Sequence, residues 1–145
     1  MTDSASAYAR ETATAVSAPA PRPRIYVDAA IHRWRGQVWC HVFSPDIPAL
    51  HRFMQQLGAR REWFQDPDTM RVSWPHYDAP EKRRAAALEA GAIALDRHQT
   101  VVMSKVIIGQ WFGMPCDPLA GHRARQSPML PRLEAWLAEE LGSSR

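Results

Sequence analysis

Cysteine is scarce in this chain of 145 residues, and its two cysteines, Cys40 and Cys116, form no CxxC pair. This scarcity argues against a disulfide framework and against a zinc site built on cysteine. Free thiols are typical of the reducing cytoplasm, where we expect the protein to reside. No apolar run approaches the roughly 18 residues that a membrane span requires, so we expect no membrane partner.

Common active-site fingerprints are missing as well. The sequence contains no P-loop, no GxGxxG or GxSxG motif and no HExxH metal motif. The usual nucleotide-binding and hydrolase patterns therefore support no function here. The formal net charge is only +3, a mild basic bias that permits a phosphate-bearing partner without requiring one.

Composition divides the chain into a central domain and two different ends. Residues 1–23 are rich in Ser, Ala, Thr and Pro, with too little apolar surface to offset the entropy of ordering. This pattern predicts a disordered tail. Apolar patterning predicts one globular domain over residues 24–113, then a loop over 114–127 and an amphipathic C-terminal helix over 128–141.

Strand and helix patterns alternate through the central domain, which predicts an α/β or α+β fold. We expect a small mixed sheet with three core helices. The predicted strands cover residues 25–27, 37–43, 61–65, 70–74 and 92–95. The predicted helices cover residues 45–57, 79–90 and 99–112, and a loop is predicted through 32–36.

Six polar side chains at element ends or on strands are candidates for chemistry: Asp28, His41, Asp46, His51, His76 and Asp78. In α/β sheets, sites form beyond the carboxyl ends of strands. Asp28 closes the first strand, His41 lies near the end of the second, and His76 precedes a helix, so these three can converge. Imidazoles with carboxylates suit zinc or another divalent metal, and they equally suit acid–base catalysis without a metal.

Several of these residues also have a purely structural explanation. Asp78 and Glu81 have the spacing of a capping box, and capping is the favoured role for Asp78. Asp46 complements a helix N-terminus, and His51 lies beside the apolar stripe of a helix. His41 is the hardest to explain structurally, because a histidine buried on an aromatic strand needs a polar partner.

A tryptophan flanked by two arginines stands out in the loop before the second strand. Trp34 lies between Arg33 and Arg35. Tryptophan and arginine together in a loop can stack on bases or bind phosphate. The blander explanation for the other tryptophans is a place in the core.

The order and spacing of several short motifs resemble a bacterial family known as domain of unknown function 4031. The resemblance rests on Tyr26-Val27-Asp28, Trp34-Arg35-Gly36, Trp39, His41, Ser44, Leu50-His51, Leu57-Gly58, Trp63-Phe64-Gln65, Pro75-His76-Tyr77-Asp78 and Gly91-Ala92. Ala29 and Pro45 stand where the family pattern often has acids, and residues 66–74 form a longer segment than usual. The resemblance covers roughly residues 25–95. It implies a shared fold and a shared polar site but no reaction.

From these residues we expect a small hydrolase, or another enzyme that handles phosphate esters, acting on a small anionic substrate. His41 is the expected general base. Asp28 and His76 are expected to orient it or to bind a divalent metal. The residues expected to contact the substrate are Arg35, for an anionic group, and Trp34 or Tyr77, as a wall of the pocket.

Two alternatives use other features of the chain. The first is a nucleic-acid or nucleotide-binding module that uses Trp34, Arg35 and Trp63. The second is a domain without chemistry that docks on a partner protein through its C-terminal helix.

Overall fold

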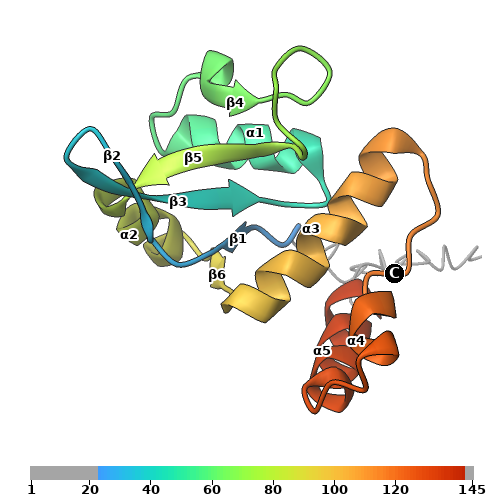
Figure 1. Ribbon diagram of the computed structural model, residues 1–145. Helices are drawn as coiled ribbons and strands as arrows, with labels where there is room; N and C mark the ends of the chain where they lie inside the picture. Colours follow the sequence, from blue (N-terminus) through green and yellow to red (C-terminus); the bar gives the residue numbers. More distant parts are fainter. Residues whose placement is uncertain (1–22, 143–145) are drawn as a thin grey trace, which may run out of the picture.

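The centre of the fold is a mixed six-stranded sheet (Figure 1). The computed structural model describes residues 23–142, so the predicted disordered tail, except for Pro23, lies outside the described residues. The strands are β1 (Tyr26–Val27), β2 (His32–Trp34), β3 (Gln37–Phe43), β4 (Phe64–Gln65), β5 (His76–Pro80) and β6 (Ile93–Ala94). Their order is β4-β5-β3-β1-β6, and β2 pairs with the start of β3. Only the β1–β6 pair is parallel among these strands.

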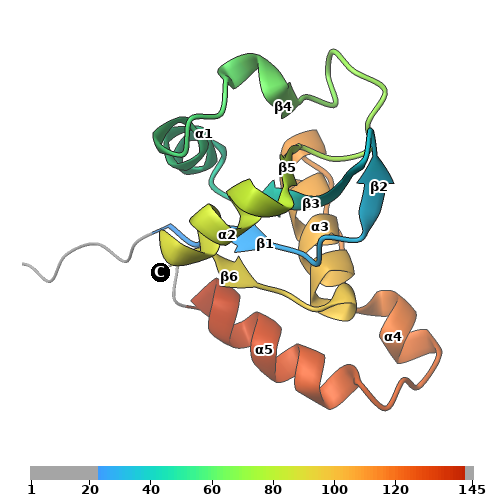
Figure 2. The same ribbon diagram turned by 90° about the vertical axis from the view of Figure 1, so that its left-hand side faces the viewer.

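Helices cover both faces of the sheet. They are α1 (Ile47–Gln56), α2 (Glu81–Glu89), α3 (Arg97–Phe112), α4 (Ala120–Ala124) and α5 (Leu130–Gly142). Figure 2 shows α1 and α2 on one side of the sheet and α3 on the other, with α5 running beneath β6. The result is a single α+β domain with a mixed sheet, as predicted from the alternating patterns.

Alternate side chains of β3 enter two separate hydrophobic cores. Cys40 and Val42 face α1 and α2, whereas Phe43 faces α3. The first core also contains Val27, Leu50, Met54, Phe64, Tyr77, Ala79 and Ala87. The second also contains Tyr26, Leu95, Val102, Met103, Ile107, Leu133 and Leu137. The strand alternates regularly because both of its faces are buried at this end.

The C-terminal helix is part of this packing. Leu133 and Leu137 of α5 lie in the second core, so its apolar stripe packs against the chain itself. Glu140 accepts hydrogen bonds from the Tyr26 hydroxyl (2.6 Å) and the Arg24 guanidinium (2.7 Å), which ties α5 to β1.

Two helices begin at aspartates. Asp46 is the N-cap of α1 and accepts a hydrogen bond from the backbone N–H of Ala49 at 3.0 Å. The helix therefore starts later than the predicted Ser44-Pro45, and the Ser44 hydroxyl instead donates to the Arg24 carbonyl. Asp96 begins α3 with a complete capping box.

Three predicted segments differ from the structure. Residues 70–74 form no strand. Residues 61–65 contribute only β4, after a short 3₁₀ helix at Arg61–Trp63. Residues 114–127, predicted as a loop, include α4.

The approach to α2 also corrects a prediction. Asp78 does not cap this helix, which begins at Glu81 with Pro80 as its N-cap. Proline disfavours the helical conformation of the residue before it, here Ala79, so the chain stays extended and forms β5. Asp78 is therefore a strand residue, and its side chain is available to the sheet.

Candidate functional site

The register of the central strands brings polar side chains together on one face of the sheet. His41 of β3 pairs with Asp78 of β5, and His76 lies two residues from Asp78 on the same face. His32 of β2 pairs with Trp39, which shares the face of His41. This is the α3 side of the sheet, because His41 shares the face of Phe43, which lies in the second core.

Asp28 comes from the irregular segment between β1 and β2, which brings it next to His41. Val27 pairs with Val42 and His32 pairs with Trp39, so residues 28–31 face only residues 40–41 on β3. This excess of residues bulges the chain. The Asp28 backbone N–H still donates to the His41 carbonyl at 3.2 Å, but the His41 N–H donates to the Asp28 side chain. Arg84 of α2 donates a 2.8 Å hydrogen bond to the Asp28 carbonyl, which holds the bulge.

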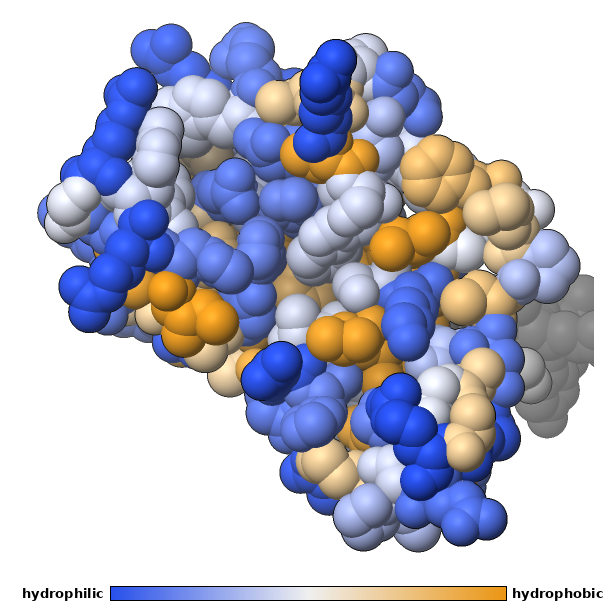
Figure 3. Space-filling view, in the orientation of Figure 1, coloured by the Kyte–Doolittle hydropathy of each residue, from blue (hydrophilic) through white to orange (hydrophobic). Residues whose placement is uncertain are grey.

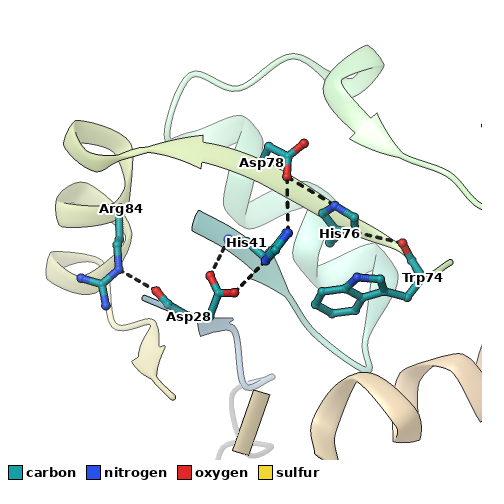
Figure 4. A network of polar contacts seen from close by, with 6 residues as sticks. All are labelled: Asp28, His41, Trp74, His76, Asp78 and Arg84. Carbon is teal, nitrogen blue, oxygen red and sulfur yellow. Dashed lines mark hydrogen bonds and ion pairs between the residues drawn. The ribbon is translucent and has the colours of Figure 1, made fainter. Parts of the chain in front are cut away.

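Both carboxylate oxygens of Asp28 contact His41 (Figure 4). Oδ1 accepts the backbone N–H of His41, and Oδ2 lies against its ring Nδ1, each at 2.6 Å. An ionised carboxylate can only accept hydrogen bonds, so Nδ1 carries the proton. The other ring nitrogen, Nε2, then points away from Asp28 and lies 3.9 Å from Oδ1 of Asp78.

His76 is held in the same way by a different acceptor. Its Nδ1 lies 2.9 Å from the backbone carbonyl of Trp74, and a carbonyl can only accept. The ring also stacks on the Trp74 indole, with centroids 4.8 Å apart. Its Nε2 therefore faces Asp78, 3.3 Å from the same Oδ1 atom.

The consequence is that two Nε2 atoms converge on one carboxylate oxygen. In neutral histidines with protonated Nδ1, both Nε2 atoms present lone pairs, which repel the lone pairs of Asp78. A proton on His76 Nε2, or a metal ion shared by the three side chains, would remove this repulsion.

Electrostatics favours positive charge at this position. Burial lowers the pKa of His41, but the hydrogen bond and charge of Asp28, together with the charge of Asp78, outweigh it and raise the pKa. Burial raises the pKa of Asp78, but the hydrogen bond of His76 and the charges of the surrounding histidines bring it below its usual value. The negative charges of Asp28 and Asp78 thus favour a positive charge on or near the His41 ring.

Two sets of side chains in the described part of the chain have the donors for a metal ion. One is His41, His76 and Asp78, and the other is Asp28, His32 and His41. Ligand bonds of about 2.0–2.2 Å in a tetrahedron separate the ligand atoms by roughly 3.3–3.6 Å. The contacts of Asp78 at 3.3 and 3.9 Å approach this spacing. The 2.6 Å contact of Asp28 with His41 is too short for it and is a hydrogen bond.

The structure brings together the three residues expected at the centre. Asp28 contacts His41, and the rings of His41 and His76 have centroids 4.8 Å apart. Tyr77 is not brought to the site, because neighbouring strand residues face opposite ways. Its hydroxyl lies 2.8 Å from Nδ1 of His51 on the α1 side.

Two residues that were not predicted at the site, Trp74 and His32, lie beside His41. Trp74 supplies the wall expected from Tyr77, with its ring centroid 5.5 Å from that of His41. His32, in a segment predicted as a loop, has its ring 4.7 Å from His41. Trp34 is the last residue of β2, at the outer end of the same face, and Arg35 follows it in the turn to β3.

One comparison with known proteins gives a match. A family model described as "Protein of unknown function (DUF4031)" matches residues 25–106, more than half of the chain and all of the site residues. Neither the curated proteins nor the solved structures contain a match. No helix within residues 23–142 is long and apolar enough to cross a membrane.

Proposed function

Because the chain belongs to the family of unknown function DUF4031, whose description states no activity, we propose a function from the site alone. The protein is a metal-dependent hydrolase, in which His41, His76 and Asp78 hold a divalent transition-metal ion. When bound, the ion would supply the Lewis acidity that activates water for hydrolysis of an ester or phosphate ester in an anionic substrate.

The observation that carries this proposal is the orientation of the two imidazoles. Each Nδ1 is bonded to an acceptor, the Asp28 carboxylate or the Trp74 carbonyl. Metal-binding histidines generally donate their second N–H to such a partner, which fixes the ring and makes the free nitrogen a better donor. Two imidazoles with one carboxylate suit zinc, iron or another transition metal rather than magnesium or calcium.

This geometry supports roles that differ from those expected from the sequence. His41 becomes a ligand through Nε2, so it is no longer the general base. Asp28 becomes a positioning residue, because both of its oxygens are engaged with His41. Asp78 takes the place of Asp28 in the ligand set.

The number of ligands supports catalysis rather than a structural role. Structural zinc sites have four protein ligands, whereas catalytic sites have three and leave a position for water. The Asp78 side chain is 42% exposed, which leaves solvent access to the junction. A metal ion held there would lower the pKa of a water bound to it. His32, which is exposed and has its ring centroid 4.7 Å from that of His41, would be the nearby base for the released proton.

Metal analysis of the full-length protein tests the proposal. After zinc loading and gel filtration, the protein should retain about one zinc ion per chain. His76→Ala and Asp78→Ala should lose it. His98→Ala is the matched control, because this exposed histidine at the start of α3 belongs to neither ligand set.

Hydrolysis is then assayed with a nitrophenyl phosphodiester and a nitrophenyl carboxylic ester. Activity should require the metal, disappear with a chelator and return when zinc or manganese is restored. Equal metal content in wild type and His76→Ala would refute the proposed site. Metal retention without turnover of either ester class would leave a binding site and refute the hydrolase.

A further inference from the structure

We propose that the substrate of this site is single-stranded nucleic acid, with one base stacked on Trp34 and a nearby phosphate at the metal junction. The placement of the phosphate at the junction rests on the function proposed above. The placement of the base on Trp34 rests on separate observations in the hairpin formed by β2 and β3.

This hairpin holds Trp34 in a fixed place. Arg35 and Gly36 have φ angles of 49° and 72°, and two successive positive values are typical of the tight turn that joins antiparallel strands. The Trp39 indole N–H donates a 3.1 Å hydrogen bond to the Trp34 carbonyl. The two indole rings also meet edge to face, with centroids 5.7 Å apart. Trp34 therefore needs little ordering when a ligand binds.

The surface of Trp34 remains open although its position is fixed. The residue is 57% exposed, more than any other tryptophan of the described chain. The Arg35 guanidinium lies 4.4 Å from its ring centroid, so a flat apolar surface and a positive charge are presented together. Aromatic rings stack on any base, and an adjacent arginine adds attraction for the backbone.

Charge favours a polyanion over a protein partner. The hairpin segment from Ile31 to Val38 carries two arginines, a histidine and no acid. Figure 3 shows mostly hydrophilic residues at this end of the molecule, with one hydrophobic patch among them, and larger hydrophobic areas over α3. Ile31 is the exposed apolar residue of the segment, at 67%. An exposed tryptophan beside two arginines and no acid fits a stacked base with its phosphates better than it fits an apolar protein surface.

The path from Trp34 to the junction is continuous along one face of the sheet. Trp34 and Gln37 pair across the hairpin, as do His32 and Trp39, so these side chains share the face of His41. Trp34 pairs with Gln37, which lies four residues before His41 on β3, so about 13 Å of strand separates Trp34 from His41. At a stacked rise of about 3.4 Å per nucleotide, this span covers roughly four nucleotides. A strand, rather than a mononucleotide, therefore reaches both ends.

The experiment uses the full-length protein, zinc-loaded and chelator-treated, with a fluorescently labelled oligothymidylate of about 10 nucleotides, a length within the usual site sizes. Binding is followed by anisotropy at low salt, where phosphate contacts are strongest. Trp34→Ala should weaken binding at least about fivefold, whereas Trp34→Phe should retain most of the affinity. Trp63→Ala is the matched control. Trp63 is also exposed and also lies under an arginine, Arg83, but that arginine belongs to α2 on the other side of the sheet.

Three outcomes would overturn the inference: equal affinity for a duplex of the same sequence, equal losses in Trp34→Ala and Trp63→Ala, or full competition by thymidine monophosphate at matched nucleotide concentration. Metal content measured on the same samples separates the two proposals. A Trp34-dependent loss of affinity without metal retention would refute the hydrolase and keep the stacking surface. Metal retention and ester hydrolysis without oligonucleotide binding would refute the stacking surface and keep the hydrolase.

Discussion

Asp28→Asn is the sharpest perturbation of the site, because it changes almost no volume and removes one acceptor. Asp28 accepts two hydrogen bonds from His41, one from the backbone N–H and one from the ring. An amide has one oxygen, so one of these donors must face an NH₂ group. If the backbone keeps the oxygen, the ring proton moves from Nδ1 to Nε2, the atom that faces Asp78. The lone pair that would bind metal is then lost.

The expected loss can be estimated from the contacts. Replacing a partner that orients a metal-binding histidine typically lowers metal affinity about 10- to 100-fold. Hydrogen bonds to charged groups contribute about 1.5–3 kcal/mol. The Asp28 and His41 side chains are only 11% and 22% exposed, so solvent screens this pair weakly. We therefore expect the metal-free Asp28→Asn variant to lose about 1–3 kcal/mol of unfolding free energy near pH 6, where His41 is charged.

Zinc affinity is measured by competition with a chelating dye, and stability by urea unfolding monitored by circular dichroism. Asp46→Asn is the matched control, because asparagine caps a helix about as well as aspartate does. Zinc affinity of Asp28→Asn within about twofold of wild type would refute the orienting role. Equal loss in Asp46→Asn would show that the effect is not specific to the site.

Four further predictions concern pH, zinc affinity and stability. In the metal-free protein, the interactions that raise the pKa of His41 stabilise the fold fully at pH values below 6.5, the ordinary pKa of histidine. This stabilisation is lost as the pH rises through the raised pKa of His41. Urea unfolding should show this decline, and His41→Gln should flatten it. Zinc affinity should instead increase with pH, because protons compete with the metal for His41. Titrations against a chelating dye will measure it, and a constant zinc affinity between about pH 5 and 7 would contradict the site. Asp96→Ala removes the cap of α3 and should cost about 0.5–2 kcal/mol in the same assay without changing zinc affinity. Glu140→Ala leaves the buried Tyr26 hydroxyl without its acceptor and should cost about 1.5–3 kcal/mol, and a cost below 0.5 kcal/mol would contradict the tie between α5 and β1.

Apolar patterns and helix-end residues correctly predicted β3, α1 and α3. β3 was predicted at its observed limits because its alternating residues serve two cores. The observed α1 and α3 begin within two residues of their predicted starts, and α3 ends at Phe112 as predicted, with Gly113 as its left-handed C-cap. The prediction was wrong for residues 70–74, where apolar residues suggested a strand but no partner pairs with them. Pairing depends on distant segments, so composition alone could not exclude this strand.

The sequence held a signal for β5 that the capping pattern obscured. Asp78 and Glu81 have the spacing of a capping box, but Pro80 lies between them. Proline disfavours helix at Ala79, so the helix had to start later and Asp78 had to precede it as extended chain. Weighing the proline above the cap would have placed Asp78 on a strand, next to His76.

No local signal could assign the roles of Asp28 and Asp78, because these roles depend on which nitrogen of His41 each carboxylate reaches. The bulge after β1 brings Asp28 to Nδ1, and the register of β3 with β5 brings Asp78 to the opposite side of the ring. A shift of one residue in that register would turn Asp78 to the face of Cys40 and Val42. The Trp74 carbonyl imposes the same division on His76. Long-range pairing, rather than residue spacing, therefore turns two histidines and two aspartates into three converging donors and one orienting acceptor.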